Sequence, residues 1–234
     1  GVAFANVMAD SFGVPLYEIC HQTGHLLAAT AGSGDEPERD FLAIHLSGGT
    51  CEMLRVKVAD YSGELIGATD DISAGQLMDR VGVKLGLAFP AGVSMERLAA
   101  SCGEKDPESI ACVPVSVRGL RLSFAGPASA LLRQADAGED AALIALRAYS
   151  AVARTLCKWI KNASVQTGLS DVLLMGGVAS SAVLRRILED RLQKARVNVT
   201  MHYADPALAS DNAIGVAIFG MRRRNESRCN EKGE

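Results

Sequence analysis

Apolar and polar residues alternate in blocks along this chain, and the spacing within the blocks predicts interleaved strands and helices. Short apolar runs predict strands at 15–20, 41–46, 51–58, 63–68, 171–175 and 197–203, with further candidates at 113–117 and 120–124. Helical spacing predicts helices at 2–12, 21–31, 73–86, 95–100, 139–164 and 180–195, and a last helix opening at Ser210. This interleaving predicts a mixed α/β fold.

The chain is long enough for one large domain, and we expect that domain to cover residues 1–221. From residue 222 onward nothing apolar remains except Cys229, so residues 222–234 are expected to form a disordered polar tail. The sequence opens at Gly1 directly into a helical pattern, without an initiator Met. We therefore expect a fragment or an N-terminally trimmed copy.

Charge and cysteine content narrow the function classes. The formal net charge is -3, so a broad electrostatic grip on nucleic acid by this chain alone is not expected. A basic stripe within 139–164 is expected to be solvated, with contact to phosphates or to an acidic partner as the alternative; it comprises Arg147, Arg154, Lys158 and Lys161. The six cysteines form no CxxC motif, and neither a signal peptide nor a membrane-spanning run is present. A cytoplasmic protein without membrane contact is the expectation.

Two histidines four residues apart, His21 and His25, lie on one face of a predicted helix. At this spacing they can hold one metal ion if a third ligand comes from elsewhere, or they are two unrelated histidines at a helix start. Asp211, at the start of the last helix, is either a carboxylate that interacts with the helix dipole or that third ligand. Two histidines and a carboxylate with open positions are associated with Fe(II), and Zn is possible.

Two strands end in paired glycines. The first junction, Leu46-Ser47-Gly48-Gly49-Thr50, either lets backbone N–H groups approach a phosphate or carboxylate, or is a plain hairpin turn. The second, at Gly176-Gly177, leads from a strand into a helix. That arrangement allows a nucleotide to lie against the backbone at a helix N-terminus, although it is also a common tight turn.

Other polar residues favour some reactions over others. Asp70, Asp71 and Asp79 cluster around one helix start, where the first two suit capping and Asp79, deeper in the helix, is the better candidate for contact with a ligand. A zinc protease would need a glutamate after the first histidine as general base. Gln22 stands there and cannot accept a proton, so this mechanism is disfavoured.

Taken together, the order of motifs resembles the family of TsaD-type tRNA threonylcarbamoyladenosine synthases, once called glycoproteases. The similar segments span nearly the whole chain: Pro15-Leu16, His21 to His25, Ser47-Gly48-Gly49, Asp79-Arg80, Phe89-Pro90-Ala91-Gly92, Leu122 to Gly126, Gly176-Gly177-Val178 and Ser210-Asp211-Asn212. The resemblance implies an actin/hexokinase/Hsp70-like (ASKHA) fold whose N-terminal portion is missing here. It also implies transfer of a threonylcarbamoyl group from threonylcarbamoyl-AMP to N6 of a tRNA adenosine.

The resemblance also assigns residues, cofactors and partners. His21, His25 and Asp211 would bind one divalent metal, Fe(II) favoured over Zn. Contacts to threonylcarbamoyl-AMP or another adenine nucleotide would come from His45, Leu46, Ser47, Gly48, Gly49, Asp79, Gly92, Gly176, Gly177 and Ser181. The tRNA would be bound through a complex with a homologous TsaB-type subunit and a small ATPase.

Three positions depart from the family pattern. Thr50 replaces a histidine, Ser181 replaces an asparagine, and Ala128 replaces a lysine. The metal ligands are intact while the nucleotide site is altered, which suggests a divergent paralog or an incomplete copy. The alternative function is therefore a non-catalytic subunit that binds nucleotide and metal as a scaffold or partner; a metalloprotease is a less favoured reading.

Overall fold

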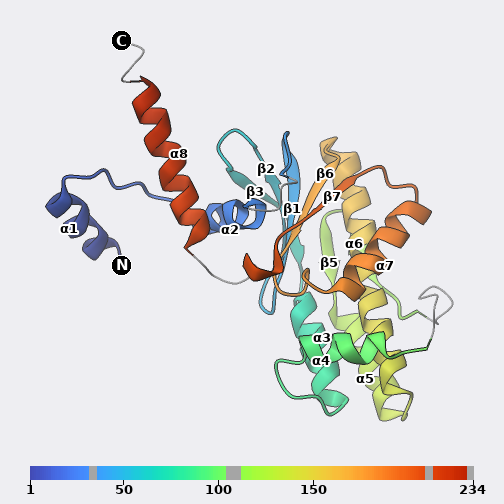
Figure 1. Cartoon of the computed structure of the whole chain (residues 1–234). Coiled ribbons are helices and arrows are strands. Elements are labelled where there is room, and N and C mark those ends of the chain that lie inside the picture. The colour runs from blue at the N-terminus through green and yellow to red at the C-terminus, as the bar shows by residue number, and fades with distance from the viewer. Residues whose placement is uncertain (32–35, 104–111, 209–212, 231–234) are drawn as a thin grey trace.

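A computed structural model describes residues 1–31, 36–103, 112–208 and 213–230, without the side chains of 226–230. Its centre is one curled sheet with helices on both faces (Figure 1). The seven strands, in the order β4-β5-β3-β2-β1-β6-β7, are β1 Phe41–Leu46, β2 Cys51–Val56, β3 Gly63–Thr69, β4 Ser116–Arg118, β5 Arg121–Ser123, β6 Asp171–Met175 and β7 Thr200–Tyr203. In the central run β3-β2-β1-β6-β7, only β2 runs opposite to the others.

The helices interleave with the strands, and all of them except α5 fall within or close to predicted helices. They are α1 Val2–Phe12, α2 His21–Thr30, α3 Ala74–Lys84, α4 Gly92–Ala100, α5 Ala125–Asp136, α6 Ala141–Thr167, α7 Ala182–Lys194 and α8 Ile214–Asn230. Asp140 caps the long helix α6 by accepting a hydrogen bond from the backbone N–H of Leu143, and Gly168 ends it in a left-handed conformation.

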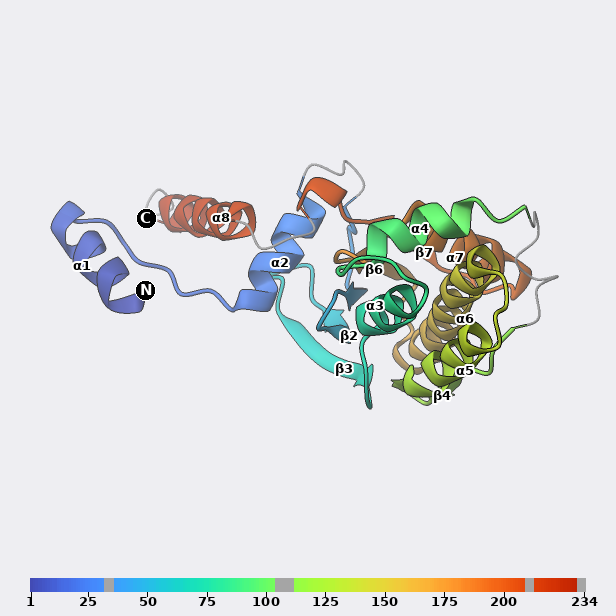
Figure 2. The same ribbon diagram turned by 90° about the horizontal axis from the view of Figure 1, so that it is seen from below.

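The alternation of side chains along β1 separates two hydrophobic cores. Leu42, Ile44 and Leu46 point into the larger core, which is shared with α3–α7. Phe41 and Ala43 point to the opposite face, where α2 packs. Figure 2 shows α2 on one side of the sheet and α3–α7 on the other. His45, which follows the same alternation as Phe41 and Ala43, therefore lies on the face that carries the predicted histidine pair.

Helix α5 was not predicted. Gly126-Pro127 favours a loop when it is read alone, but proline is tolerated in the first turn of a helix, where its missing N–H has no partner to lose. The Asp71 carboxylate accepts hydrogen bonds from the backbone N–H groups of Phe124 (2.9 Å) and Ala125 (3.3 Å). Asp71 therefore caps a helix that begins more than fifty residues later in the chain.

The hydrogen bonds at this helix end make the ionised carboxylate of Asp71 stabilising for the folded state. Partial burial opposes the ionised form, but hydrogen bonds from Ser123, Phe124, Ile72 and Ala125 outweigh it and hold the pKa of Asp71 below its ordinary value. Asp70 is different, because it only forms a surface ion pair with Arg121.

We expect Asp71→Asn to lower the free energy of unfolding by about 1 kcal/mol at neutral pH, since a neutral amide is a weaker cap. Because the folded-state pKa is depressed, the difference from wild type is full above about pH 4 and is lost as pH falls through the folded pKa. Urea unfolding from pH 7 down to pH 3 would measure it, with Asp70→Asn as control. A pH-independent difference would show that charge plays no part.

Two terminal segments differ from the prediction. The strand expected at 15–20 was wrong: this stretch connects α1 to α2 without pairing to any described strand, and Val14 and Leu16 are exposed. The expected tail from residue 222 lies partly within α8, which continues to Asn230, while 231–234 lie outside the described residues.

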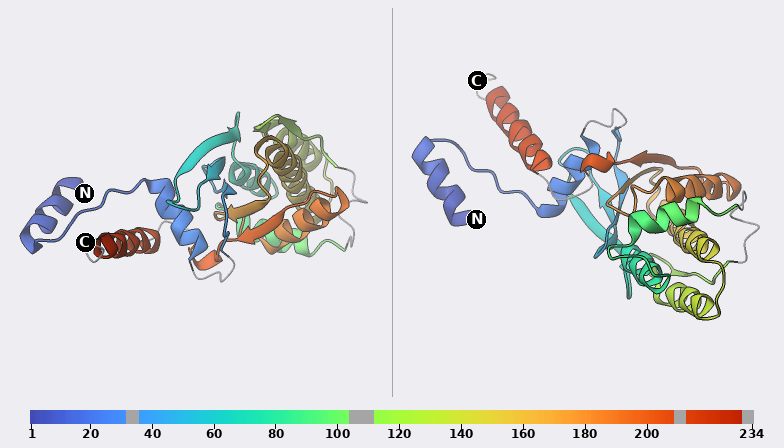
Figure 3. Two further views of the ribbon diagram at one scale, coloured as in Figure 1. Left: turned by 90° about the horizontal axis from the view of Figure 1, so that it is seen from above. Right: turned by 60° about the horizontal axis from the view of Figure 1, so that its bottom comes forward.

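Helix α1 forms as predicted, with Gly13 left-handed at its end, but its apolar face is not covered. Phe4 is 70% and Phe12 68% exposed. Figure 3 shows α1 and α8 extending away from the sheet on the side of α2. Within the described part of the chain, no helix has the length and apolar character needed to cross a membrane.

Candidate functional site

The two Gly-Gly junctions meet at one edge of the sheet. Strands β1 and β6 are parallel neighbours, with His45 opposite Met175, so their carboxyl ends lie side by side. The backbone N–H of Val178 donates to the Leu46 carbonyl oxygen at 3.1 Å and ties one junction to the other. Ligands of open α/β sheets bind outside such carboxyl ends. Sequence reasoning placed both junctions at strand ends, and the fold brings them together.

The first junction is also a hairpin turn, one of the two readings left open. The backbone N–H of Ser47 donates to the Thr50 carbonyl oxygen, and the Ser47 hydroxyl accepts from the Thr50 N–H, both at 2.9 Å. The N-terminus of α3 packs directly on this turn, because the Ser73 hydroxyl donates to the Gly48 carbonyl oxygen at 2.6 Å. Gly75 must lack a side chain here, since a Cβ would lie 2.6 Å from Gly48 Cα.

A cavity of about 310 Å³ opens beside these junctions, between α3, α4 and the start of α7. It is lined by Gly48, Gly75, Met78, Asp79, Pro90, Gly92, Val93, Glu96, Tyr149, Gly177, Val178, Ser180 and Ser181. Half of the residues that the resemblance assigns to the substrate are among them: Gly48, Asp79, Gly92, Gly177 and Ser181. Residues separated by more than a hundred positions in the sequence thus surround one space large enough for a small polar molecule.

Asp79 holds one wall of the cavity in place. One of its carboxylate oxygens accepts a hydrogen bond from the Ala91 backbone N–H at 2.8 Å, which fixes the Phe89–Gly92 loop against α3. Both Asp79 and the loop residues Pro90 and Gly92 line the space. Of the three aspartates in the predicted cluster, Asp79 lines this cavity and Asp70 and Asp71 do not; its contact with a ligand stays a prediction.

Glu96 and Tyr149 line the cavity but were missed by the sequence analysis. Glu96 accepts hydrogen bonds from the Ser181 hydroxyl (2.9 Å) and from the Val183 backbone N–H (3.2 Å). The Tyr149 hydroxyl donates to the Gly92 carbonyl oxygen at 3.3 Å, and burial raises the pKa of Tyr149 to about 12. Tyr149 therefore remains a neutral donor at physiological pH.

The position of Glu96 offered one signal, because it follows Gly92 by one helical turn and shares its face of α4. Tyr149 offered none, since its spacing matches the buried face of α6. The other residues assigned to the substrate, His45, Leu46, Ser47, Gly49 and Gly176, do not line the cavity. Leu46 is buried in the larger core and contributes its backbone carbonyl.

The histidine pair lies at the start of α2, and the Nε2 atoms of His21 and His25 are 3.0 Å apart. Two nitrogens that bind one ion at about 2.0–2.1 Å, with an angle between 90° and 110°, lie about 2.9–3.4 Å apart, so the pair fits a shared metal. Both line a separate cavity of about 230 Å³. Asp211 lies outside the described residues, and within them no group of three His, Cys, Asp or Glu is placed to hold a metal.

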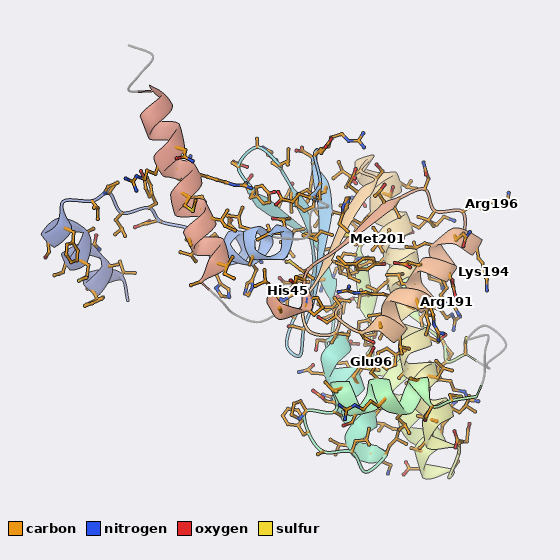
Figure 4. All side chains as sticks on the ribbon, in the orientation of Figure 1. His45, Glu96, Arg191, Lys194, Arg196 and Met201 are labelled. Atoms are coloured by element: carbon orange, nitrogen blue, oxygen red, sulfur yellow. The ribbon has the colours of Figure 1, made fainter. Side chains whose placement is uncertain are left out.

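His45 lies between the histidine pair and the Gly176 junction, although it lines neither cavity. Its ring centroid is 5.4 Å from that of His25, and its Cδ2 would lie 2.8 Å from a Cβ added to Gly176. Figure 4 shows His45 at the end of β1 and Glu96 below it on α4. The histidine pair and the second glycine junction therefore both lie next to His45.

The basic stripe of α6 is partly structural. Arg147 pairs with Glu139 and donates to Gln134, while Arg154 donates to the Val113 carbonyl oxygen at 2.8 Å. Lys158 and Lys161 are exposed, as expected of a solvated face. Arg147 and Arg154 are therefore engaged within the fold, whereas Lys158 and Lys161 face solvent.

Comparison with known proteins decides the family. The sequence model of TsaD, described as tRNA N6-adenosine threonylcarbamoyltransferase, matches residues 1–218. This chain belongs to the TsaD family. A family member from Chromobacterium violaceum, a tRNA N6-adenosine threonylcarbamoyltransferase, is 31% identical over 233 residues, which cover 95% of this chain and 67% of that protein. One from Syntrophotalea carbinolica is 32% identical over 230 residues, covering 94% and 64%. The chain thus spans about two thirds of the length of these relatives.

Solved structures confirm the fold expected of a TsaD protein. HypF from T. kodakarensis matches with a TM-score of 0.69 at 16% identity, over 94% of this chain and 38% of that chain. Full-length HypF in a phosphate- and nucleotide-bound form matches with a TM-score of 0.65 at 15% identity, over 91% and 37%. The chain has the actin/hexokinase-like fold.

The three residues that differ from the TsaD pattern lie in three different places in the fold. Ser181 lines the cavity, and its hydroxyl donates to Glu96 and caps α7. Thr50 closes the hairpin turn beside Ser47. Ala128 is 3% exposed and packs in the larger core, away from the cavity lining. Only the substitution at Ser181 changes a side chain that lines the cavity.

Proposed function

We propose that this chain carries the donor site of a threonylcarbamoyl transferase, which moves the group from threonylcarbamoyl-AMP to N6 of a tRNA adenosine. The observation that supports this most is the gathering of Gly48, Asp79, Gly92, Gly177 and Ser181 around one cavity in a chain of the TsaD family. The family resemblance assigns these residues to the nucleotide, and the fold gathers them around one space.

The cavity offers complementary groups to an adenylate. The glycine junctions present backbone N–H groups to its phosphate at the N-terminal end of α7. Asp79 and Glu96 are carboxylates suited to accept hydrogen bonds from ribose hydroxyls. In the reaction, a bond forms between N6 and the carbamoyl carbon, the bond from that carbon to the AMP phosphate oxygen breaks, and one proton leaves N6. The residues of the cavity hold the departing AMP in place.

The metal of the proposal is held by His21 and His25, whose nitrogens have a spacing that fits a shared ion. Asp211 is the third ligand by resemblance. Fe(II) is favoured for two histidines and a carboxylate, and Zn is the alternative. When bound, the ion polarises the carbamoyl group as a Lewis acid. The proximity of His45 to His25 on one side and to Gly176 on the other supports a metal near the glycine junctions of the cavity proposed for the adenylate, here called the adenylate cavity.

The partners of the proposal also follow from the family resemblance. The tRNA is bound in a complex that contains a TsaB-type subunit and a small ATPase. No disulfide joins the five cysteines that the structure describes, which suits the reducing compartment proposed here, the cytoplasm.

Asp79→Asn tests the proposed function. We expect it to weaken AMP binding, measured by calorimetry, by about 10- to 100-fold, because hydrogen bonds to a charged group contribute about 1.5–3 kcal/mol. Asp190→Asn, an exposed position on α7 outside the cavity, is the control. Transfer to tRNA is then assayed with wild type.

AMP binding without transfer, even with the TsaB-type subunit and the ATPase present, would support the non-catalytic subunit instead. Absence of AMP binding by folded wild type, or equal affinity in Asp79→Asn, would overturn the assignment of the cavity.

A further inference from the structure

A second hollow of about 560 Å³ adjoins the adenylate cavity on the outside of α3. It is lined by Gln76, Asp79, Arg80, Val83, Lys84, Phe89 and Leu132, and we call it the α3–α5 groove. Asp79 lines both spaces, and Phe89 is followed directly by Pro90, which lines the cavity. The α3–α5 groove therefore continues the proposed site; its lining comes from α3, α5 and the loop before α4, which lie at the lower end of Figure 1.

An aromatic ring stands exposed at this place. Phe89 is 74% exposed although the larger core lies close by. Its loop is held at Ala91 by Asp79, and the Tyr149 hydroxyl donates to the Gly92 carbonyl oxygen. The ring is thus presented by a fixed backbone, next to the apolar side chains of Val83 and Leu132. A rigidly presented aromatic face is what stacking with a nucleobase requires.

The charges in the groove favour an anionic partner. Lys84 is paired with Asp136, and Asp79 is engaged by the Ala91 N–H. Arg80 is exposed and forms no hydrogen bond or ion pair with any residue that the structure describes. One guanidinium therefore remains available beside the exposed ring, in a geometry suited to a phosphate.

We propose that the α3–α5 groove binds an unpaired nucleotide of the RNA acceptor, with its base stacked on Phe89 and its phosphate on Arg80. The inference rests on the proposed function, because continuity with the adenylate cavity is what brings an RNA strand to this place. It adds a specific contact through which a chain of negative net charge meets RNA: one aromatic platform and one free cation, rather than a broad basic surface.

Substitutions at Phe89 separate stacking from simple apolar contact. The probe is a short RNA hairpin with an unpaired adenosine next to 5-iodouridine, used for fluorescence anisotropy and for photo-crosslinking to wild type and variants. We expect the crosslink at the peptide that contains Phe89. Phe89→Leu should weaken binding about 5- to 150-fold, while Phe89→Trp retains it, since base–aromatic stacking contributes about 1–3 kcal/mol per base. Val165→Ala, an exposed apolar position on α6, is the control.

Arg80→Ala should weaken binding and reduce the slope of log affinity against log salt by about 0.7, the value for one phosphate contact on a single strand. Arg133→Ala, on α5 outside the groove lining, should leave both unchanged. Wild-type affinity in Phe89→Leu would overturn the proposal and indicate an apolar docking surface for a protein segment. A crosslink elsewhere, or no RNA binding by protein that binds AMP, would overturn it as well. If RNA binding depends on Phe89 but the protein does not bind AMP, the RNA contact stands and only the proposed donor site is refuted.

Discussion

Gly176→Ala is expected to lower the free energy of unfolding by about 3 kcal/mol or more. Gly176 has a φ of 101°, which L side chains rarely adopt, and such strain costs about 1–3 kcal/mol. An added Cβ would also overlap the Leu46 carbonyl oxygen and lie 2.8 Å from Cδ2 of His45. Backbone cannot yield as a flexible side chain does, so overpacking adds a similar amount. The measurement is urea unfolding followed by circular dichroism.

The neighbouring Gly177→Ala is the matched control, because its added Cβ would meet nothing within 4 Å and its φ is not positive. We expect a change in stability of less than about 1 kcal/mol there. Gly177 lines the adenylate cavity, so this variant should lose AMP affinity rather than stability. Equal destabilisation by the two substitutions would contradict the close approach of β6 to β1 at Leu46.

His25→Ala is expected to weaken metal binding by more than about 100-fold, since loss of a direct ligand exceeds the 10–100-fold cost of losing an outer-shell partner. Wild type purified without chelators should contain about one equivalent of Fe or Zn, and the variant almost none. Plasma emission spectrometry measures the content. His21→Ala should behave alike, and so should Asp211→Ala by the family resemblance.

Gln22→Ala is the control on the same helix, because Gln22 donates to Glu52 rather than facing the histidine pair. It should keep its metal. Folded wild type without stoichiometric metal would refute the shared site. Retention of metal in Asp211→Ala, together with loss in His25→Ala, would show that the third ligand is a different residue.

Long segments with a regular apolar pattern predicted their helices and strands correctly. Short segments, and those interrupted by glycine and proline, did not. The apolar face of 139–164 and the runs at 41–46 and 171–175 correspond to α6, β1 and β6, because burial against one continuous core decides them. Helix α5 escaped prediction because its cap, Asp71, comes from a distant loop that no local pattern contains. The run at 15–20 has the composition of a strand, but β structure requires a neighbour to pair with, and composition does not supply one.

The candidate site also combines features that the sequence predicts with features that it does not. Glycine pairs and the histidine spacing are local signals, and the sequence located them at the ends of the correct elements. The sequence does not show which of these residues share a cavity. That depends on the register of β1 against β6 and on the Asp79–Ala91 hydrogen bond, which are tertiary contacts. Glu96 was hidden for this reason, since its partners Ser181 and Val183 belong to the start of another helix.

The two walls of the proposed adenylate cavity are held by different kinds of interaction. On one side, the backbone hydrogen bond from Val178 to Leu46 ties β6 to β1. The sheet-side wall is held by the β1–β6 ladder and by the close approach of Gly176 to Leu46, where an added Cβ would find no room. The opposite wall, the loop from Phe89 to Gly92, is held by hydrogen bonds to the side chains of Asp79 and Tyr149. One wall of the cavity is therefore set by backbone pairing and the other by two side chains, so substitutions at Asp79 or Tyr149 would loosen the cavity from the loop side alone.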